Sequence, residues 1–162
     1  MANPAKEGFQ GIAFGVMDGV ILALGVITGL SVLENRFILF LSLLATGIAD
    51  AFGNAAGMHV EEETEKDHGR KEVWISTISA FFSTFFVFIL LIIPILILPL
   101  SLAVTVSWLF GIILLALLGI KVAEIRGWNS SKIVIEYVLW GIAVSVASYL
   151  LISGVKELSL GL

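Results

Sequence analysis

The sequence predicts an all-α membrane protein of five transmembrane helices, and two observations carry that prediction. Of its 162 residues, 59% are hydrophobic and only 14% are charged, whereas a soluble domain usually carries about 25% charged residues. The apolar residues also form long stretches separated by short charged or proline-containing segments, and about 20 such residues are enough for a helix to cross a bilayer. We therefore expect a multi-pass protein of the cell membrane or of an organelle membrane.

The first two helices are expected at residues 9–33 and 37–60, since both stretches have the length of a membrane crossing. The first ends at the charged segment ENR. The second runs into the acidic segment EEETEKDHGRKE, at residues 61–72. We interpret this segment as a short cytoplasmic loop or an extension of the helix.

The remaining apolar sequence divides into three helices. Residues 73–120 contain no charge, and this stretch is too long for one crossing. Pro94 and Pro99 lack backbone N–H donors and favour a tight turn between two helices. A further apolar stretch follows a polar segment near the C-terminus. The three expected helices are residues 73–97, 100–120 and 133–155.

The basic residues predict the orientation of the chain, because they gather on the cytoplasmic side of membrane proteins. With five crossings, residues 61–72 and the segment after residue 120 share a side with the N-terminus. The other side carries only Arg36 and Lys156. We therefore expect a cytoplasmic N-terminus and a single transmembrane domain over residues 1–162. The basic residues on the cytoplasmic side are Lys6, Lys66, Arg70, Lys71, Lys121, Arg126 and Lys132.

Glycines recur at steps of four along the first helix, at Gly11, Gly15 and Gly19, and the spacing repeats at Gly25 and Gly29. Small residues at this spacing let two helices approach backbone to backbone. The partner is either the same helix of a second copy or another helix of the same chain. Five short helices can hardly enclose an aqueous path, which favours a homodimer with the path between its subunits.

Asp18 lies in the middle of this apolar, glycine-rich helix. A charge at mid-membrane costs from about 3 to more than 10 kcal/mol, and intramembrane carboxylates often line ion paths. We interpret Asp18 as such a residue, with a protonated structural acid as the alternative. Asp50, about ten residues before the acidic segment, is expected at a similar depth on the second helix.

The second helix carries polar residues at steps of three or four, which places them in one stripe. Their oxygen atoms suit hard divalent cations, and a methionine thioether tolerates softer ones. We interpret the acidic end of the stripe as a vestibule that collects cations, with a solvated helix end as the alternative. His59 and His68 are left open as ligands. Together with Asp18, the predicted metal ligands are Asp50, Asn54, Met58, Glu61, Glu62 and Glu65.

Two segments resemble the vacuolar iron transporter family. FGVMDGVILALGVITGL has the aspartate–glycine pair of the family's first helix at Asp18 and Gly19. IADAFGNAAGMHVEEE has the alanine–aspartate pair of its second helix at Ala49 and Asp50. The motifs cover about the first 65 residues, and the expected five crossings fit the family throughout.

The sequence also departs from the family's pattern. Asn54 stands where the family has a methionine, Met58 where it has a glutamate or asparagine, and Gly53 where it usually has a serine. Plant and fungal members carry a long acidic domain between the second and third helices, and only about a dozen residues separate these helices here. A complete cytoplasmic metal-storage domain is therefore not expected.

The resemblance implies a homodimer that moves a divalent metal out of the cytosol in exchange for protons, along a path between the subunits. Ferrous iron is the first candidate for the metal and manganese the second, and no permanently bound cofactor is expected. The expected partners are a second copy, the lipid bilayer and divalent metal ions. The net charge of −4 gives no reason to expect nucleic acid.

Two other functions are left open by the sequence. A passive divalent cation channel would use the same stripe without proton coupling, and a non-transporting membrane scaffold would use the glycine faces only for assembly. An enzyme is not expected, because the sequence contains no nucleophile–base pair, phosphate-binding loop or HExxH pattern. The absence of cysteine excludes thiolate metal sites.

Overall fold

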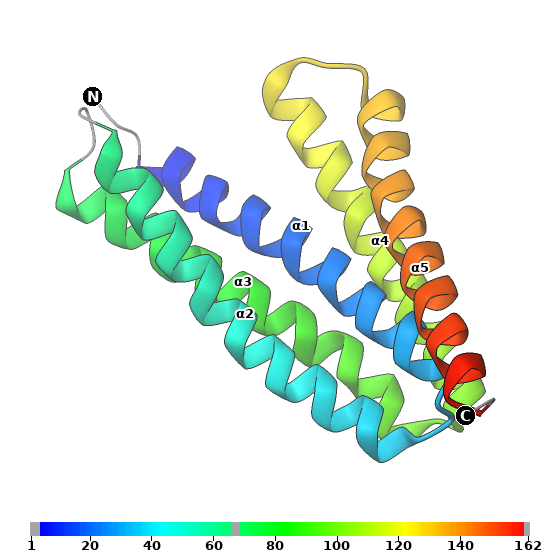
Figure 1. Cartoon of the computed structure of the whole chain (residues 1–162). Helices are drawn as coiled ribbons and strands as arrows, with labels where there is room; N and C mark the ends of the chain where they lie inside the picture. Colours follow the sequence, from blue (N-terminus) through cyan, green and yellow to red (C-terminus); the bar gives the residue numbers. More distant parts are fainter. Residues whose placement is uncertain (1–3, 66–68, 161–162) are drawn as a thin grey trace.

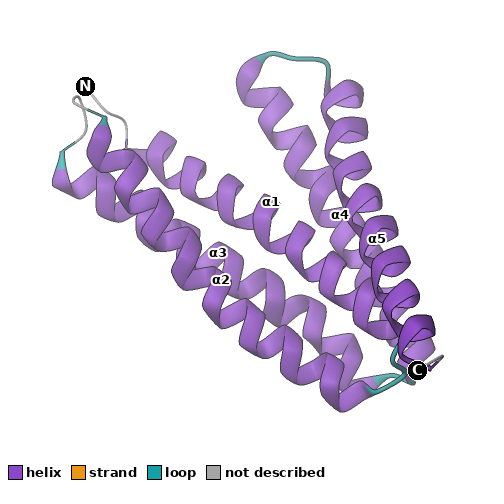
Figure 2. Ribbon diagram, in the orientation of Figure 1, coloured by secondary structure: helices purple, strands orange, loops and turns teal. Residues whose placement is uncertain are grey.

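The computed structural model describes residues 4–65 and 69–160, and this part of the chain is helical without any strand (Figure 2). All of its helices are long and apolar enough to cross a membrane, so the prediction of a multi-pass membrane protein is confirmed. In chain order the helices are α1 (Pro4–Ser31), α2 (Arg36–Thr64), α3 (Arg70–Ile97), α4 (Leu100–Arg126) and α5 (Ser130–Leu160).

The helices extend beyond most of the expected crossings, because their ends continue into the charged boundary regions. α2 runs to Thr64 and α3 begins at Arg70, so most of the acidic segment belongs to helix ends. Asn35 caps α2 by accepting a hydrogen bond from the Ile38 N–H at 3.0 Å. α4 ends at Arg126 and is followed by Gly127, whose φ of +66° is a left-handed conformation that glycine adopts without steric cost.

The two prolines act differently at the turn between α3 and α4. Pro99 directly precedes the first residue of α4, as its missing N–H allows. Pro94 stays inside the last turn of α3, where its carbonyl accepts a hydrogen bond from the Leu98 N–H at 3.0 Å. The turn therefore begins after Ile97, as the sequence predicted.

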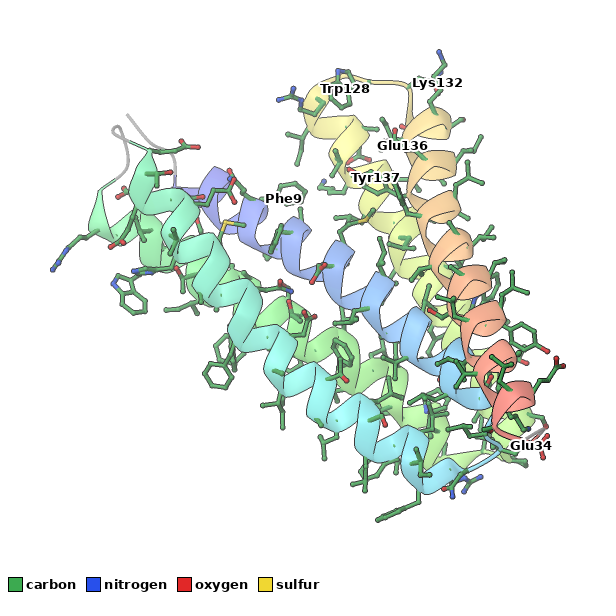
Figure 3. The ribbon with its side chains drawn as sticks, in the orientation of Figure 1. Phe9, Glu34, Trp128, Lys132, Glu136 and Tyr137 are labelled. Atoms are coloured by element: carbon green, nitrogen blue, oxygen red, sulfur yellow. The ribbon has the colours of Figure 1, made fainter. Side chains whose placement is uncertain are left out.

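α1 is the central helix of the fold and contacts each of the other four. It lies between the α2–α3 pair and the α4–α5 pair (Figure 1). The two pairs converge at the C-terminal end of α1 and diverge toward its N-terminal end. Trp128 and Lys132 lie at the diverging end, and Glu34 lies at the converging end (Figure 3).

The apolar core fills the converging half of the molecule. It joins Leu24 of α1, Leu43 of α2, Leu91 of α3 and Leu115 of α4, all fully buried. At the same end, the side chain of Arg36 donates to the carbonyl of Leu98. The buried residues toward the diverging end include polar ones, such as Asn54, Glu62 and Ser76.

The glycines of α1 pack within the chain, which is the alternative to self-association that the sequence left open. A Cβ atom at Gly11 would overlap the backbone carbonyl of Ser76 on α3. At Gly15 it would lie 2.6 Å from the carbonyl oxygen of Ala80. The glycine ladder therefore lets α3 approach α1 and does not support a dimer formed through α1.

Gly25 and Gly29 pack against a different helix, α5. A Cβ atom at Gly25 would lie 3.1 Å from Val144 Cγ2, and one at Gly29 would lie 3.2 Å from Ile152 Cγ1, both on α5. The α4–α5 pair is thereby held against the C-terminal half of α1, where the two pairs of helices converge.

Candidate cation site at the middle of the helices

Asp18 and Asp50 lie close together at the middle of the α1–α2 pair. Asp18 lies near the midpoint of α1 (Pro4–Ser31), and Asp50 lies at the midpoint of α2 (Arg36–Thr64). Because consecutive helices run in opposite directions, their midpoints fall at the same depth. The Asp50 carboxyl lies within electrostatic and hydrogen-bonding range of Asp18, and both side chains are half-buried.

Asn54 holds the Asp18 carboxylate in place. Its Nδ2 atom donates to Asp18 Oδ2 at 3.0 Å and to Thr84 Oγ1 at 3.1 Å. A carboxylate can only accept hydrogen bonds, so the amide must turn its NH₂ group toward Asp18. Both amide protons are then used, and the Oδ1 atom of Asn54 is the group left to accept from a proton donor or bind a cation.

Thr84 connects this network to the backbone of α1. Its hydroxyl donates to the carbonyl of Gly15 at 3.2 Å, an approach that the missing side chain of Gly15 permits. One chain of hydrogen bonds thus joins α1, α2 and α3 at a single level. Sequence reasoning missed Thr84; the signal was a row of hydroxyl residues on α3, at Ser76, Ser83 and Thr84, opposite the glycines.

One Asp50 oxygen has no partner within the described part of the chain. Oδ2 of Asp50 is buried and accepts no hydrogen bond there. Desolvating a carboxylate oxygen without a partner is costly. Asp50 Oδ2 is therefore a carboxylate oxygen that can still accept a hydrogen bond or bind a cation.

The inward stripe of α2 continues from Asn54 to Met58 and Glu62, in steps of four residues. Asn54 is 8% exposed, Met58 2% and Glu62 1%. Each step of four residues rotates the side-chain position by about 40° around the helix axis. The row remains on the buried side of α2 as far as Glu62. Glu61 and Glu65, which the expected stripe also included, are exposed and lie outside this buried row.

The acidic end of α2 therefore has two kinds of carboxylate. Glu61 and Glu65 are exposed at the end of the stripe. Glu62 is buried among the helices, where a carboxylate is retained only with interacting neighbours. His68 lies outside the described residues.

His59 interacts with protein groups through both ring nitrogens. Nδ1 lies 3.0 Å from Thr77 Oγ1, and Nε2 lies 3.4 Å from Glu63 Oε1. Its ring also packs edge to face against Trp74, with 4.9 Å between centroids. His59 thus faces the outer surface between α2 and α3, on a different side of α2 from Asn54.

The described part of the chain supplies an incomplete set of metal ligands. Within the described residues, no three histidine, aspartate or glutamate side chains gather closely enough to hold a metal ion. The central level offers the two carboxylates Asp18 and Asp50 and the Asn54 amide oxygen, while six or more oxygen ligands are typical of hard divalent cations. The remaining ligands would have to be water or residues of a second subunit.

No family model and no curated protein matches the sequence. The function is therefore inferred from the site itself. It is a pair of carboxylates at the middle of two membrane-spanning helices, with a buried polar stripe leading from the pair to one end of the bundle.

Proposed function

We propose that the protein exports a divalent metal, with ferrous iron first and manganese second, from the cytosol in exchange for protons. This is the activity of the vacuolar iron transporter family, which the Asp18 and Asp50 motifs resemble. The observation that carries the proposal is that the Asp18 and Asp50 carboxyl groups lie close together at the midpoints of α1 and α2.

Electrostatics explains why such a pair can exchange metal for protons. Two carboxylates in contact repel one another when both are ionised, unless a positive charge lies with them. That charge can be a proton shared by the pair or a divalent cation between them. Because the two compete for the same oxygens, metal binding releases protons and protons displace the metal.

The open face of α2 supports a homodimer. Ala49, Gly53 and Gly57 form an exposed row at steps of four, and a Cβ atom at either glycine would meet nothing within 4 Å. Rows of small residues allow close helix pairing in membranes. Asp50 lies beside this row on the helix surface, so a second copy packed there would bring its own carboxylates to the incomplete site.

The remaining stripe provides a route to the pair. Glu61 and Glu65 would concentrate cations at the cytoplasmic mouth, where exposed charges act mainly through local concentration. Glu62 and Met58 would then pass the ion inward through a buried segment. A thioether ligand favours borderline ions such as Fe²⁺ over harder ones.

Proteoliposomes with an imposed pH gradient test the proposal. Wild-type protein should accumulate Fe²⁺ and Mn²⁺ when driven by the pH gradient alone, with protons moving in the opposite direction. Asp18→Asn keeps the size of the side chain and removes its charge and titration, so it should abolish metal-dependent proton movement. Glu136→Gln, which changes an exposed carboxylate of α5, is the matched control and should behave like wild type.

Three outcomes would contradict the proposal. If Asp18→Asn vesicles exchange protons for metal at the wild-type rate, the coupling site is elsewhere. If metal moves only down its own gradient, the protein is a passive channel. If folded wild-type protein moves no divalent ion, the scaffold hypothesis is favoured.

A further inference from the structure

Thr84 of α3 determines which end of the Asn54 amide faces Asp18. Thr84 is fully buried, and Asn54 is 8% exposed. A threonine hydroxyl has a single proton, and Thr84 donates it to the carbonyl of Gly15 at 3.2 Å. Toward Asn54, the Thr84 Oγ1 atom can therefore only accept a hydrogen bond, which it does from Nδ2 at 3.1 Å. The amide must place its NH₂ group, and not its oxygen, on this side.

The packing of α1 against α3 fixes the Thr84 hydroxyl in this role. A Cβ atom at Gly15 would lie 2.7 Å from Thr84 Oγ1, so the hydroxyl occupies space that any other residue at position 15 would fill. Thr84 cannot turn its proton toward Asn54 without leaving the Gly15 carbonyl. The direction of the hydroxyl is thus set by the contact between two helices and not by Asp18 or Asp50.

We propose that Thr84 is a positioning residue that weakens cation binding at the central site by holding the Asn54 amide oxygen away from Asp18. This inference rests on the proposed transport function. A cation between the two carboxylates meets an N–H donor of Asn54 in place of an oxygen ligand. The amide must rotate before its Oδ1 atom can bind the ion, and rotation breaks the hydrogen bond to Thr84.

A transport site benefits from such a cost. Conduction requires a site that binds an ion well enough to admit it and weakly enough to release it. Carboxylate and amide oxygens together suit hard divalent cations, so a site that used Asp18, Asp50 and the Asn54 oxygen freely would hold the ion longer. Thr84 makes the third oxygen available only at the expense of a buried hydrogen bond.

Calorimetric titration of the purified full-length protein with Mn²⁺ tests this role, with Thr84→Val as the variant. Valine keeps the shape of threonine and cannot accept a hydrogen bond. The variant should bind Mn²⁺ about two- to tenfold more tightly than wild type, as expected when one hydrogen bond that opposes binding is removed. In proteoliposomes it should lower both the apparent Km for Mn²⁺ and the maximal rate, because a more tightly bound ion is released more slowly.

Three variants keep the test specific. Thr84→Ser retains the hydroxyl and should bind Mn²⁺ like wild type. Thr105→Val makes the same replacement at an exposed threonine of α4, whose hydroxyl donates to the Ser101 carbonyl at 3.1 Å, and should also behave like wild type. If Thr84→Val does not fold, Thr84→Ala removes the same acceptor without adding bulk, and the same increase in affinity is expected.

Nuclear magnetic resonance of the metal-free protein, with selective labelling of asparagine, reports the amide itself. Both side-chain amide protons of Asn54 are hydrogen-bonded in the structure. They should be protected from exchange with water in wild type and in Thr84→Ser, and they should exchange faster in Thr84→Val.

Three results would overturn the inference. Unchanged or weaker Mn²⁺ binding by the folded Thr84→Val and Thr84→Ala variants would mean that the amide orientation does not limit affinity. Altered binding in Thr84→Ser would mean that Thr84 acts through its packing. Wild-type protein that binds neither Mn²⁺ nor Fe²⁺ would contradict the transport proposal as well, whereas the first two results would leave that proposal standing.

Discussion

Replacing Gly15 by alanine should show whether the glycine ladder of α1 packs within the chain or forms a subunit interface. The structure places Gly15 against α3, where a Cβ atom would lie 2.6 Å from Ala80 O and 2.7 Å from Thr84 Oγ1. Ordinary carbon–oxygen contacts begin near 3.3 Å, so α1 and α3 would have to separate by roughly 0.7 Å. The variant should therefore lose stability and disturb the hydrogen bond from Thr84 to Gly15.

The magnitude follows from a comparison with Gly19→Ala. At Gly19 the nearest atoms to a new Cβ, Thr84 Cα and Cγ2, lie at 3.4 Å, which is an ordinary contact. Both variants gain the same helix propensity, about 1 kcal/mol, so this gain cancels in the difference between them. Overpacking at Gly15 should leave that variant about 1–3 kcal/mol less stable than Gly19→Ala.

Thermal unfolding of the detergent-solubilised protein measures this difference. For a chain of this size each 1 kcal/mol corresponds to about 2–4 °C in Tm, so Gly15→Ala should unfold several degrees below Gly19→Ala. Size-exclusion chromatography with light scattering would report the oligomeric state of both. If Gly15→Ala is as stable as Gly19→Ala but separates subunits, the ladder lies at a subunit interface and the packing described for α1 and α3 is wrong.

Two further predictions concern the stripe on α2. Met58→Leu keeps the volume of a buried side chain and should cost less than about 1.5 kcal/mol of stability. In a competition assay it should raise Mn²⁺ transport relative to Fe²⁺ transport. An unchanged ratio of the two rates would mean that the thioether does not lie on the ion path. The double variant Glu61→Gln with Glu65→Gln should raise the apparent Km for metal with little effect on the maximal rate, because both residues are exposed. Glu62→Gln should instead lower the maximal rate. Loss of transport at saturating metal in the double variant would mean that the essential site is at the mouth.

Hydropathy predicts much of the fold. The positions of Asp18 and Asp50 along their helices predict that the two residues lie at the same depth. Five apolar stretches predict five helices, and the turn between α3 and α4 was predicted from Pro94 and Pro99. Asp18 and Asp50 lie at the same level because each lies near the midpoint of one of two consecutive antiparallel helices. These features depend on local sequence and on chain direction, which a single sequence contains.

The details that depend on helix packing were not predicted. A row of small residues predicts a close contact without naming its partner, so the sequence could not say that Gly11 and Gly15 pack on α3. The burial of Glu62 instead of Glu61 depends on how α2 is rotated against its neighbours, and one residue changes the direction of a side chain by about 100°. Thr84 entered the site for the same reason, because only the packing of α3 brings it to Asn54.

Asn54 gives the site a property that the methionine found at this position in the vacuolar iron transporter family, which the sequence resembles, would not provide. Both of its amide protons are used, one for Asp18 and one for Thr84. Under the proposed function, a cation between Asp18 and Asp50 competes with the amide N–H for the Asp18 oxygen, and the amide must rotate before Oδ1 can bind the ion. That rotation breaks the hydrogen bond to Thr84, and with it a link between α2 and α3. A thioether has no N–H to donate, so at position 54 only the amide connects the occupancy of the site to the contact between these helices.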